Sequence, residues 1–343
     1  MLYAEIEIGS FLKARRAALE PADLGLPGGV NRRRVRGLRR EEVAQLAGIS
    51  VDYYTRIEQG RAHTISDSVL DALARALRLS GGEATYLRNI AVPRRRSGAG
   101  CASGERCASG EGCASGEGCA AGCCGPGAVV RRRVRPGIRQ LLDAMDHTVP
   151  AMIVGRGLDI LAWNALGGRL AFDLEALAPD RRNTALLVFL DPVARELHPD
   201  WEAKAVEVVG NLRADSGRYP DDPRVCAVVN ELLARSADFR RIWETQSVHE
   251  CLRGTKRIQH PEVGALDVTF ESFRLSADED QCLVTYTAPR GSETERRLRK
   301  LRKLGEREEL EEMEQLGELG EMGERLGGGR SLMPAGPVPP SAP

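Results

Sequence analysis

One segment, LRREEVAQLAGISVDYYTRIEQGR at residues 38–61, limits the fold of this chain more than any other. Apolar residues at helical spacing give its first half one buried face: Val43, Leu46 and Ala47. Gly48 permits the left-handed turn that ends such a helix. Ser50 is a natural N-cap for a second helix, in which Tyr54 and Ile57 would pack inward. Two short helices around a tight glycine turn predict a helix-turn-helix.

The flanking sequence extends this motif to a helical bundle over residues 1–92. An amphipathic helix precedes it and ends at Pro21, and SDSVLDALARALRLS and GGEATYLRNIA supply two helices after it. Residues 1–135 carry 22 basic and 14 acidic side chains, a net charge of +8, whereas residues 136–290 carry 18 and 24, a net charge of −6. This segregation indicates a polyanion-binding module joined to a unit that does not touch the polyanion.

Residues 38–61, with SDSVLDALARAL after them, resemble the lambda-repressor-like helix-turn-helix domain of the XRE family of bacterial regulators, and within it the actinobacterial MmyB-like branch. The resemblance covers about residues 8–92 and implies double-stranded DNA as partner, with the second helix in the major groove. The residues that it places on the groove-facing side are Val51, Asp52, Tyr53, Thr55 and Arg56. Among them only Arg56 has the donor fork suited to guanine or phosphate. The candidates for phosphate neutralisation are Arg15, Arg16, Arg32, Arg33, Arg34 and Arg61, although a surface arginine taken singly is usually just solvated.

Residues 134–290 have the pattern of a second folded unit. AMIVG and DILAWN are short apolar strands joined by a turn at Arg156 and Gly157, which predicts a hairpin. Helical segments follow, and GALDVTFESFRL and QCLVTYTAP supply two later strands. This order predicts an α+β domain with one antiparallel sheet and a helical cover. The phrases DILAWN, LVFLDPVARELHPDWE, GTKRIQHPEVG and CLVTYTAPRGS resemble the PAS-like ligand-binding domain that follows the helix-turn-helix in the same family.

The second resemblance implies a hydrophobic cavity between sheet and helices, with a fatty-acid-like ligand. Our candidates for its lining are Met152, Val154, Ile160, Trp163, Asn164, Phe189, Trp201, Phe270 and Tyr286, and each apolar one of them also fits an ordinary core position. Trp163 and Asn164 would place an aromatic wall beside an amide that orients a polar head group. The sequence has no GxSxG motif, no phosphate loop and no carboxylate pair at motif-like spacing. We therefore expect a binding protein and not an enzyme, with no cofactor, and a structural hydrogen bond for His260.

Two segments lie outside these units, residues 93–133 and 291–343. The first holds six of the nine cysteines, four of them at six-residue steps: Cys101, Cys107, Cys113, Cys119, Cys123 and Cys124. Structural zinc sites space their cysteines differently, so we expect a low-complexity linker and no metal site, with a thiol-based metal or redox sensor as the alternative. The second segment combines leucines at helical steps with interrupting glycines, which predicts a frayed helix or a disordered tail.

The sequence thus predicts a multidomain protein, in which an all-α lambda-repressor-like helix-turn-helix domain (1–92) and a linker (93–133) precede an α+β PAS-like domain (134–290) and a charged tail (291–343). No apolar run approaches the ~18 residues of a membrane span. We expect a cytoplasmic, sequence-specific transcriptional regulator that forms a homodimer and responds to a small apolar ligand. The alternative is a constitutive DNA-binding dimer whose second domain is a protein-interaction module without ligand.

Overall fold

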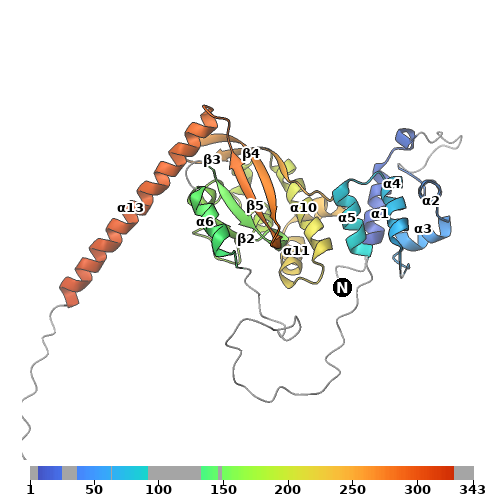
Figure 1. Ribbon diagram of the computed structural model, residues 1–343, viewed down its shortest axis with the longest axis horizontal. Coiled ribbons are helices and arrows are strands. Elements are labelled where there is room, and N and C mark those ends of the chain that lie inside the picture. Colours follow the sequence, from blue (N-terminus) through green and yellow to red (C-terminus); the bar gives the residue numbers. More distant parts are fainter. Residues whose placement is uncertain (1–6, 25–36, 63, 92–132, 146–148, 328–343) are drawn as a thin grey trace, which may run out of the picture.

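The N-terminal part of the protein is a helical bundle. The computed structural model describes residues 7–24, 37–62, 64–91, 133–145 and 149–327. The bundle comprises α1 (Glu7–Ala18), the 3-10 turn η1 (Pro21–Leu24), α2 (Arg40–Ala47), α3 (Val51–Glu58), α4 (Asp67–Ala76) and α5 (Gly81–Ala91), in blue and cyan in Figure 1. Its core is fully buried and includes Phe11, Tyr54, Ile57 and Tyr86, so each of α1, α3 and α5 contributes an apolar face.

The helix-turn-helix predicted from the sequence is confirmed. Gly48 ends α2 with φ 67° and ψ 32°, a conformation that suits glycine, and its N–H donates to the Gln45 carbonyl at 3.2 Å. Ser50 then caps α3, because its Oγ accepts a hydrogen bond from the Tyr53 N–H at 3.1 Å. The turn fixes the angle between α2 and α3.

The second part is an α+β domain with one antiparallel sheet, as predicted. Its strands are β1 (Ala151–Val154), β2 (Ile160–Trp163), β3 (Arg253–His260), β4 (Gly264–Leu275) and β5 (Asp278–Thr287), in the order β2-β1-β5-β4-β3. The short turn η2 (Arg156–Leu158) joins β1 to β2, and Gly157 adopts φ 64° there. The predicted first hairpin is therefore present.

Alternation along the strands gives the sheet two different faces. Ala151, Ile153 and Leu283 pack with Leu142 of α6 (Pro136–Ala144). Met152 and the residues paired with it, Trp163 and Val284, point to the opposite face, toward the helical layer. That layer contains α7 (Ala165–Gly168), α8 (Thr184–Leu190), α9 (Ala194–Leu197), α10 (Trp201–Arg218), α11 (Pro223–Arg235) and α12 (Ala237–Glu244).

One strand was missed by the sequence prediction, and the predicted tail contains a helix. Strand β3 was not among the predicted strands. Helix α13 (Glu293–Gly327) occupies much of the segment expected as a frayed helix or disordered tail, and it extends away from the sheet in Figure 1. Its first turns are held because Leu298 and Leu301 are buried in the same cluster as Leu266 and Val268 of β4. The domain boundaries themselves stay predictions, and the cysteine repeat lies outside the described residues.

The two domains contact each other directly. Helix α5 lies beside α10 (Figure 1), where Gly217 has no side chain and Tyr86 occupies the space: a Cβ on Gly217 would lie 2.5 Å from the Tyr86 ring. Ala214 of α10 and Val248, which follows α12, belong to the buried core of the bundle. A hydrogen bond from Arg15 to the Thr245 carbonyl adds a polar contact across this junction.

Candidate recognition helix and ligand cavity

Helix α3 presents the side chains expected to enter the major groove. Val51, Asp52 and Arg56 are exposed, and Tyr53 and Thr55 are half-buried. The Thr55 hydroxyl donates to the Val51 carbonyl at 2.8 Å, so it is satisfied within the helix. Within the described parts of the chain, the Arg56 guanidinium has no ion-pair partner. The face can therefore present one free cationic fork to a base pair or phosphate.

The buried carboxylate of Glu58, at the end of α3, ties this helix to α1 and α2. Glu58 accepts hydrogen bonds from Arg16 Nε at 3.1 Å and from Arg40 Nη2 at 2.9 Å. Arg16 Nη1 also donates to the Leu38 carbonyl at 2.7 Å. Burial raises the pKa of Glu58, but the two guanidiniums outweigh burial and hold that pKa below its usual value. Glu58 is thus an ion-pair acid that joins α3 to Arg16 and Arg40.

The basic residues proposed for phosphate contacts fall into three groups. Arg16 is committed to Glu58, and Arg15 pairs with Glu83 at 2.6 Å and donates to the Thr245 carbonyl of the second domain at 3.1 Å. The geometry therefore assigns Arg15 and Arg16 structural contacts instead of free positions for DNA. Arg61 is exposed, just after α3. Arg32, Arg33 and Arg34 lie outside the described residues.

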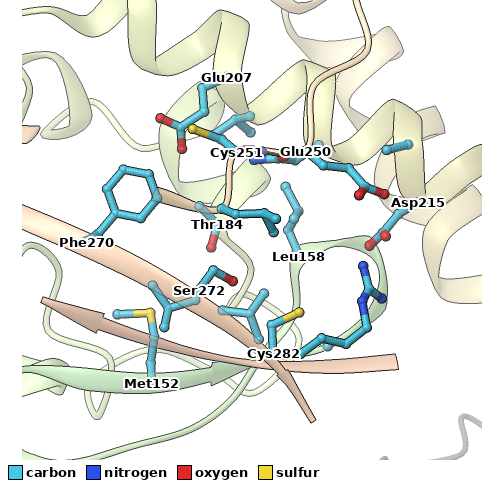
Figure 2. Close-up of a pocket in the computed structure, with 18 of the residues that line it drawn as sticks. Met152, Leu158, Thr184, Glu207, Asp215, Glu250, Cys251, Phe270, Ser272 and Cys282 are labelled. Atoms are coloured by element: carbon cyan, nitrogen blue, oxygen red, sulfur yellow. Dashed lines mark hydrogen bonds between the residues drawn. The ribbon is translucent and has the colours of Figure 1, made fainter. Parts of the chain in front are cut away.

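A cavity of about 150 Å³ separates the sheet from α10. Figure 2 shows Met152, Phe270, Ser272 and Cys282 on the sheet side, with Glu207 and Asp215 facing them from the helical side. A second cavity of about 70 Å³ adjoins it. Both are lined by the same five residues at their boundary: Met152, Thr184, Lys204, Lys256 and Tyr286. We call the two cavities the larger and the smaller lobe.

Five of the nine candidate lining residues lie in these walls. Met152 and Tyr286 line both lobes, Val154 and Phe270 line the larger one, and Ile160 lines the smaller one. The smaller lobe is otherwise mainly apolar, and its further apolar lining residues are Leu170, Ala171, Phe172, Leu174, Leu187, Val188 and Ile258. The prediction of an apolar space between sheet and helices thus describes the smaller lobe.

The other four candidates lie in neither lobe. Asn164 caps α7: its Oδ1 accepts from the N–H groups of Gly167 at 2.8 Å and Ala151 at 3.0 Å, so its amide holds the backbone. The Trp163 ring packs outside the lobes, with the Arg182 guanidinium 4.9 Å from its centroid. Phe189 and Trp201 belong to the core of the helical layer, with their ring centroids 5.7 Å apart. These four side chains stabilise the fold and do not line the cavity. The sequence could not show this, because the order of residues does not determine which face of a helix or strand reaches a cavity.

Charged side chains at the boundary between the lobes were missed by the sequence analysis. Lys204 Nζ lies 3.2 Å and Lys256 Nζ 2.8 Å from the same atom, Oε1 of Glu207. Burial lowers the pKa of Lys204 and the nearby Lys256 ammonium lowers it further. Burial opposes ionisation of Glu207, but the two lysines prevail and lower its pKa. The available signal was the Lys204–Glu207 pair, three residues apart in a segment predicted as helical.

A second polar group closes the other end of the larger lobe. Asp215 accepts a hydrogen bond from the Gly157 N–H at 2.9 Å, and burial raises its pKa to about 6. Arg218, one turn further along α10, pairs with Glu250. The segment that carries Glu250 also supplies Cys251 and Leu252 to the cavity wall. This wall segment begins beside Val248, which is buried in the core of the DNA-binding bundle.

Two histidines of the second domain, His198 and His260, are buried. His260 Nδ1 accepts from the Glu262 N–H at 3.1 Å, so Nε2 carries the proton and donates to the Arg169 carbonyl at 2.9 Å. This is the structural hydrogen bond expected for His260. His198 is buried beside the smaller lobe, and burial lowers its pKa to about 4, so its imidazole is neutral. Among the described residues, no His, Cys, Asp and Glu side chains cluster in a way that could hold a metal ion.

Comparison with known families gives two matches in chain order. Residues 7–87 match the model of a helix-turn-helix domain, and residues 134–301 match the MmyB-like transcription regulator ligand binding domain. No curated protein matches the chain. Within the part of the chain that the structure describes, every helix is too short or too polar to cross a membrane. The second match extends past β5 into α13, in agreement with the burial of Leu298.

Proposed function

The chain belongs to the helix-turn-helix transcription regulators that carry an MmyB-like ligand-binding domain, and from this premise we propose that it binds specific DNA sequences under the control of a small ligand in the lobes. The proposal rests on the position of α10, which contacts both the ligand cavity and the DNA-binding bundle. Its Lys204, Glu207 and Asp215 face the lobes, and Gly217 faces the DNA-binding bundle. Ala214 lines the larger lobe and also packs into the core of the bundle. One rigid helix thus connects the ligand cavity to the DNA-binding domain.

The DNA-binding half of the proposal rests on α3. We propose that Arg56 contacts a base or phosphate, that Val51, Asp52, Tyr53 and Thr55 complete the contact surface, and that Arg61 reaches the DNA backbone. The chain acts as a homodimer in this proposal, because two copies of α3 would read two half-sites one helical turn apart. We place the protein in the cytoplasm, where its DNA target lies.

The ligand half rests on the lobes. We propose a fatty-acid-like occupant whose apolar part fills the smaller lobe, since each buried CH₂ contributes about 0.8 kcal/mol. For such a ligand to regulate, its affinity must differ between the DNA-bound and the free protein. A ligand that displaces Cys251 or Leu252 from the cavity wall would move the segment that also carries Val248, and so would act on the bundle core.

Selection of bound double-stranded DNA from a random pool, repeated with Arg56→Ala, tests this function. The selected sequence should be bound by the wild-type chain, and Arg56→Ala should weaken binding by about 1–3 kcal/mol, the value of one bidentate base contact. Arg257→Ala removes the same charge from an exposed position on β3 and should leave binding unchanged. Enrichment of no sequence, or equal binding by Arg56→Ala, would contradict the assignment of α3.

A further inference from the structure

Lys204 places a primary amine inside the ligand cavity. Its side chain is 14% exposed, and it lines both lobes at their boundary. A lysine on the surface keeps its charge in water, whereas this one lies between a helix and a sheet. A molecule that crosses from one lobe to the other therefore lies beside the Lys204 side chain.

Two amines at this boundary share one carboxylate. Lys204 Nζ lies 3.2 Å and Lys256 Nζ 2.8 Å from the same atom, Oε1 of Glu207. Two ammonium groups held this close repel each other, and the repulsion is stronger where water is scarce. Loss of one proton removes the repulsion and leaves a single ammonium paired with the carboxylate. The arrangement thus favours a neutral amine on one of the two lysines.

The surroundings of the two lysines differ in a way that selects Lys204 as the neutral one. Lys256 Nζ lies closer to the carboxylate and 3.8 Å from the centroid of the Phe270 ring, whose face attracts a cation. Burial lowers the pKa of Lys204 and Lys256 lowers it further, whereas Glu207 opposes both. A larger fraction of Lys204 than of an ordinary lysine is therefore the free amine, which is the nucleophilic form.

Three other titratable side chains line the lobes with Lys204, and all are neutral. Burial lowers the pKa of His198 to about 4, and it raises the pKa of the Tyr286 hydroxyl and of the Cys251 thiol. These three groups therefore supply neither a further cation nor a further anion. The protonation of Lys204 is set by the shared carboxylate and the second amine.

We propose that Lys204 forms a reversible imine with a small aldehyde or reactive ketone in the lobes, with Glu207 as the proton carrier. The Nζ lone pair forms the C–N bond, and the two hydrogens of the free amine depart with the carbonyl oxygen as water, so the step needs no oxidant or reductant. Glu207 Oε1 lies 3.2 Å from Nζ and can accept the first proton and pass it to that oxygen. This inference rests on the proposed ligand-binding function of the lobes and adds a second class of ligand, which is bound covalently.

Reductive trapping of the full chain with benzaldehyde tests the proposal. The larger lobe measures about 150 Å³, and an apolar cavity of this volume holds a molecule the size of benzene. Sodium cyanoborohydride converts the imine into a stable secondary amine, which peptide mapping by mass spectrometry locates. At about pH 6.5 exposed lysines are almost entirely protonated. Among the lysines, Lys204 should therefore carry most of the adduct and the exposed Lys300 little. Lys204→Met should lose this adduct, and the control Lys300→Met should keep it.

Lys256→Met gives a pH signature that a purely structural lysine would not give. The variant removes the cation that lowers the pKa of Lys204 and leaves Glu207, which raises it. Labelling of Lys204 at about pH 6.5 should fall, and its pH profile should shift to higher pH. Equal labelling of Lys204 and Lys300 in the wild-type chain, or an unchanged profile in Lys256→Met, would overturn the proposal.

Thermal unfolding with octanoate separates the imine from the proposed function. Octanoate forms no imine, so a rise in the melting temperature reports only on ligand binding by the lobes. Such a rise without labelling of Lys204 would refute the imine and leave the ligand-binding function standing. If octanoate gave no rise and Lys204 no adduct, both would fail.

Discussion

Replacing Glu58 by Gln should destabilise the DNA-binding bundle, because it removes the charge on which two arginines converge. The Glu58 side chain is 3% exposed, and that of Arg16 is 14% exposed. Gln keeps the volume and one acceptor oxygen, but Arg16 would remain as a buried cation without a counterion. Breaking a buried pair in this way costs about 3–5 kcal/mol. Arg40 adds little to this value, because its side chain is 45% exposed and well solvated. We expect a loss of about 3 kcal/mol in the free energy of unfolding.

Urea denaturation followed by two probes measures this loss. Far-ultraviolet circular dichroism reports on all helices, whereas the three tryptophans, Trp163, Trp201 and Trp243, all lie in the second domain. Because the two domains share a buried core, the circular dichroism and tryptophan transitions of Glu58→Gln should both shift to lower urea. Glu41→Gln, an exposed change on α2, is the matched control and should stay within about 0.5 kcal/mol of wild type. A similarly small change in Glu58→Gln would refute the counterion argument.

The same network has a pH signature. The pKa of Glu58 lies below its ordinary value in the folded protein, since Arg16 and Arg40 outweigh burial. Its stabilising contribution is therefore present above the unfolded pKa of about 4.5 and is lost as the pH falls through the folded pKa. The gap in stability between the wild type and Glu58→Gln should be widest at neutral pH and should shrink on acidification.

Three further variants test other parts of the structure. Burial raises the pKa of Asp215 from 3.8 to about 6, so the ionised carboxylate destabilises the fold above that pH. Asp215→Asn removes the charge and can still accept the hydrogen bond from the Gly157 N–H. In thermal unfolding it should stabilise the protein by about 2 kcal/mol at pH 7.5 and have no effect at pH 4. Gly217→Ala should cost about 1–3 kcal/mol in urea denaturation by pushing its Cβ against the Tyr86 ring, whereas Gly81→Ala, with open space around it, should not. Deleting residues 99–124 should leave operator affinity near wild type in a filter-binding assay, and a bound metal lost on deletion would support the thiol-sensor alternative.

Short sequence patterns were sufficient to predict the elements whose structure depends only on neighbouring residues. The glycine turn and the Ser50 cap of the helix-turn-helix need only a few neighbouring residues, and both form as predicted. The hairpin of β1 and β2 follows in the same way from two apolar runs around Gly157. In each case the signal and the structure that it specifies lie within about a dozen residues.

Elements that depend on distant partners could not be predicted in this way. Strand β3 reads RGTKRIQH, and none of its first five residues has an apolar side chain. Only its pairing with β4 defines it as a strand. Helix α13 looks like a solvated tail until Leu298 and Leu301 meet β4. The lysines at the lobe boundary come from α10 and β3, which are some fifty residues apart. Sequence spacing gives no indication that they share one carboxylate.

Because Val248 and Ala214 are buried in the bundle core, the two domains cannot be separated into fragments without exposing apolar surface. A fragment ending at residue 92 would leave a hole where these two side chains pack and would expose the Tyr86 surface of α5. A fragment ending at residue 290 would uncover Leu266 and Val268 in the place of α13. Exposed apolar surfaces of this kind promote aggregation. Heat should therefore melt the two domains in one cooperative transition, and truncation at either boundary should broaden the melt and lower solubility.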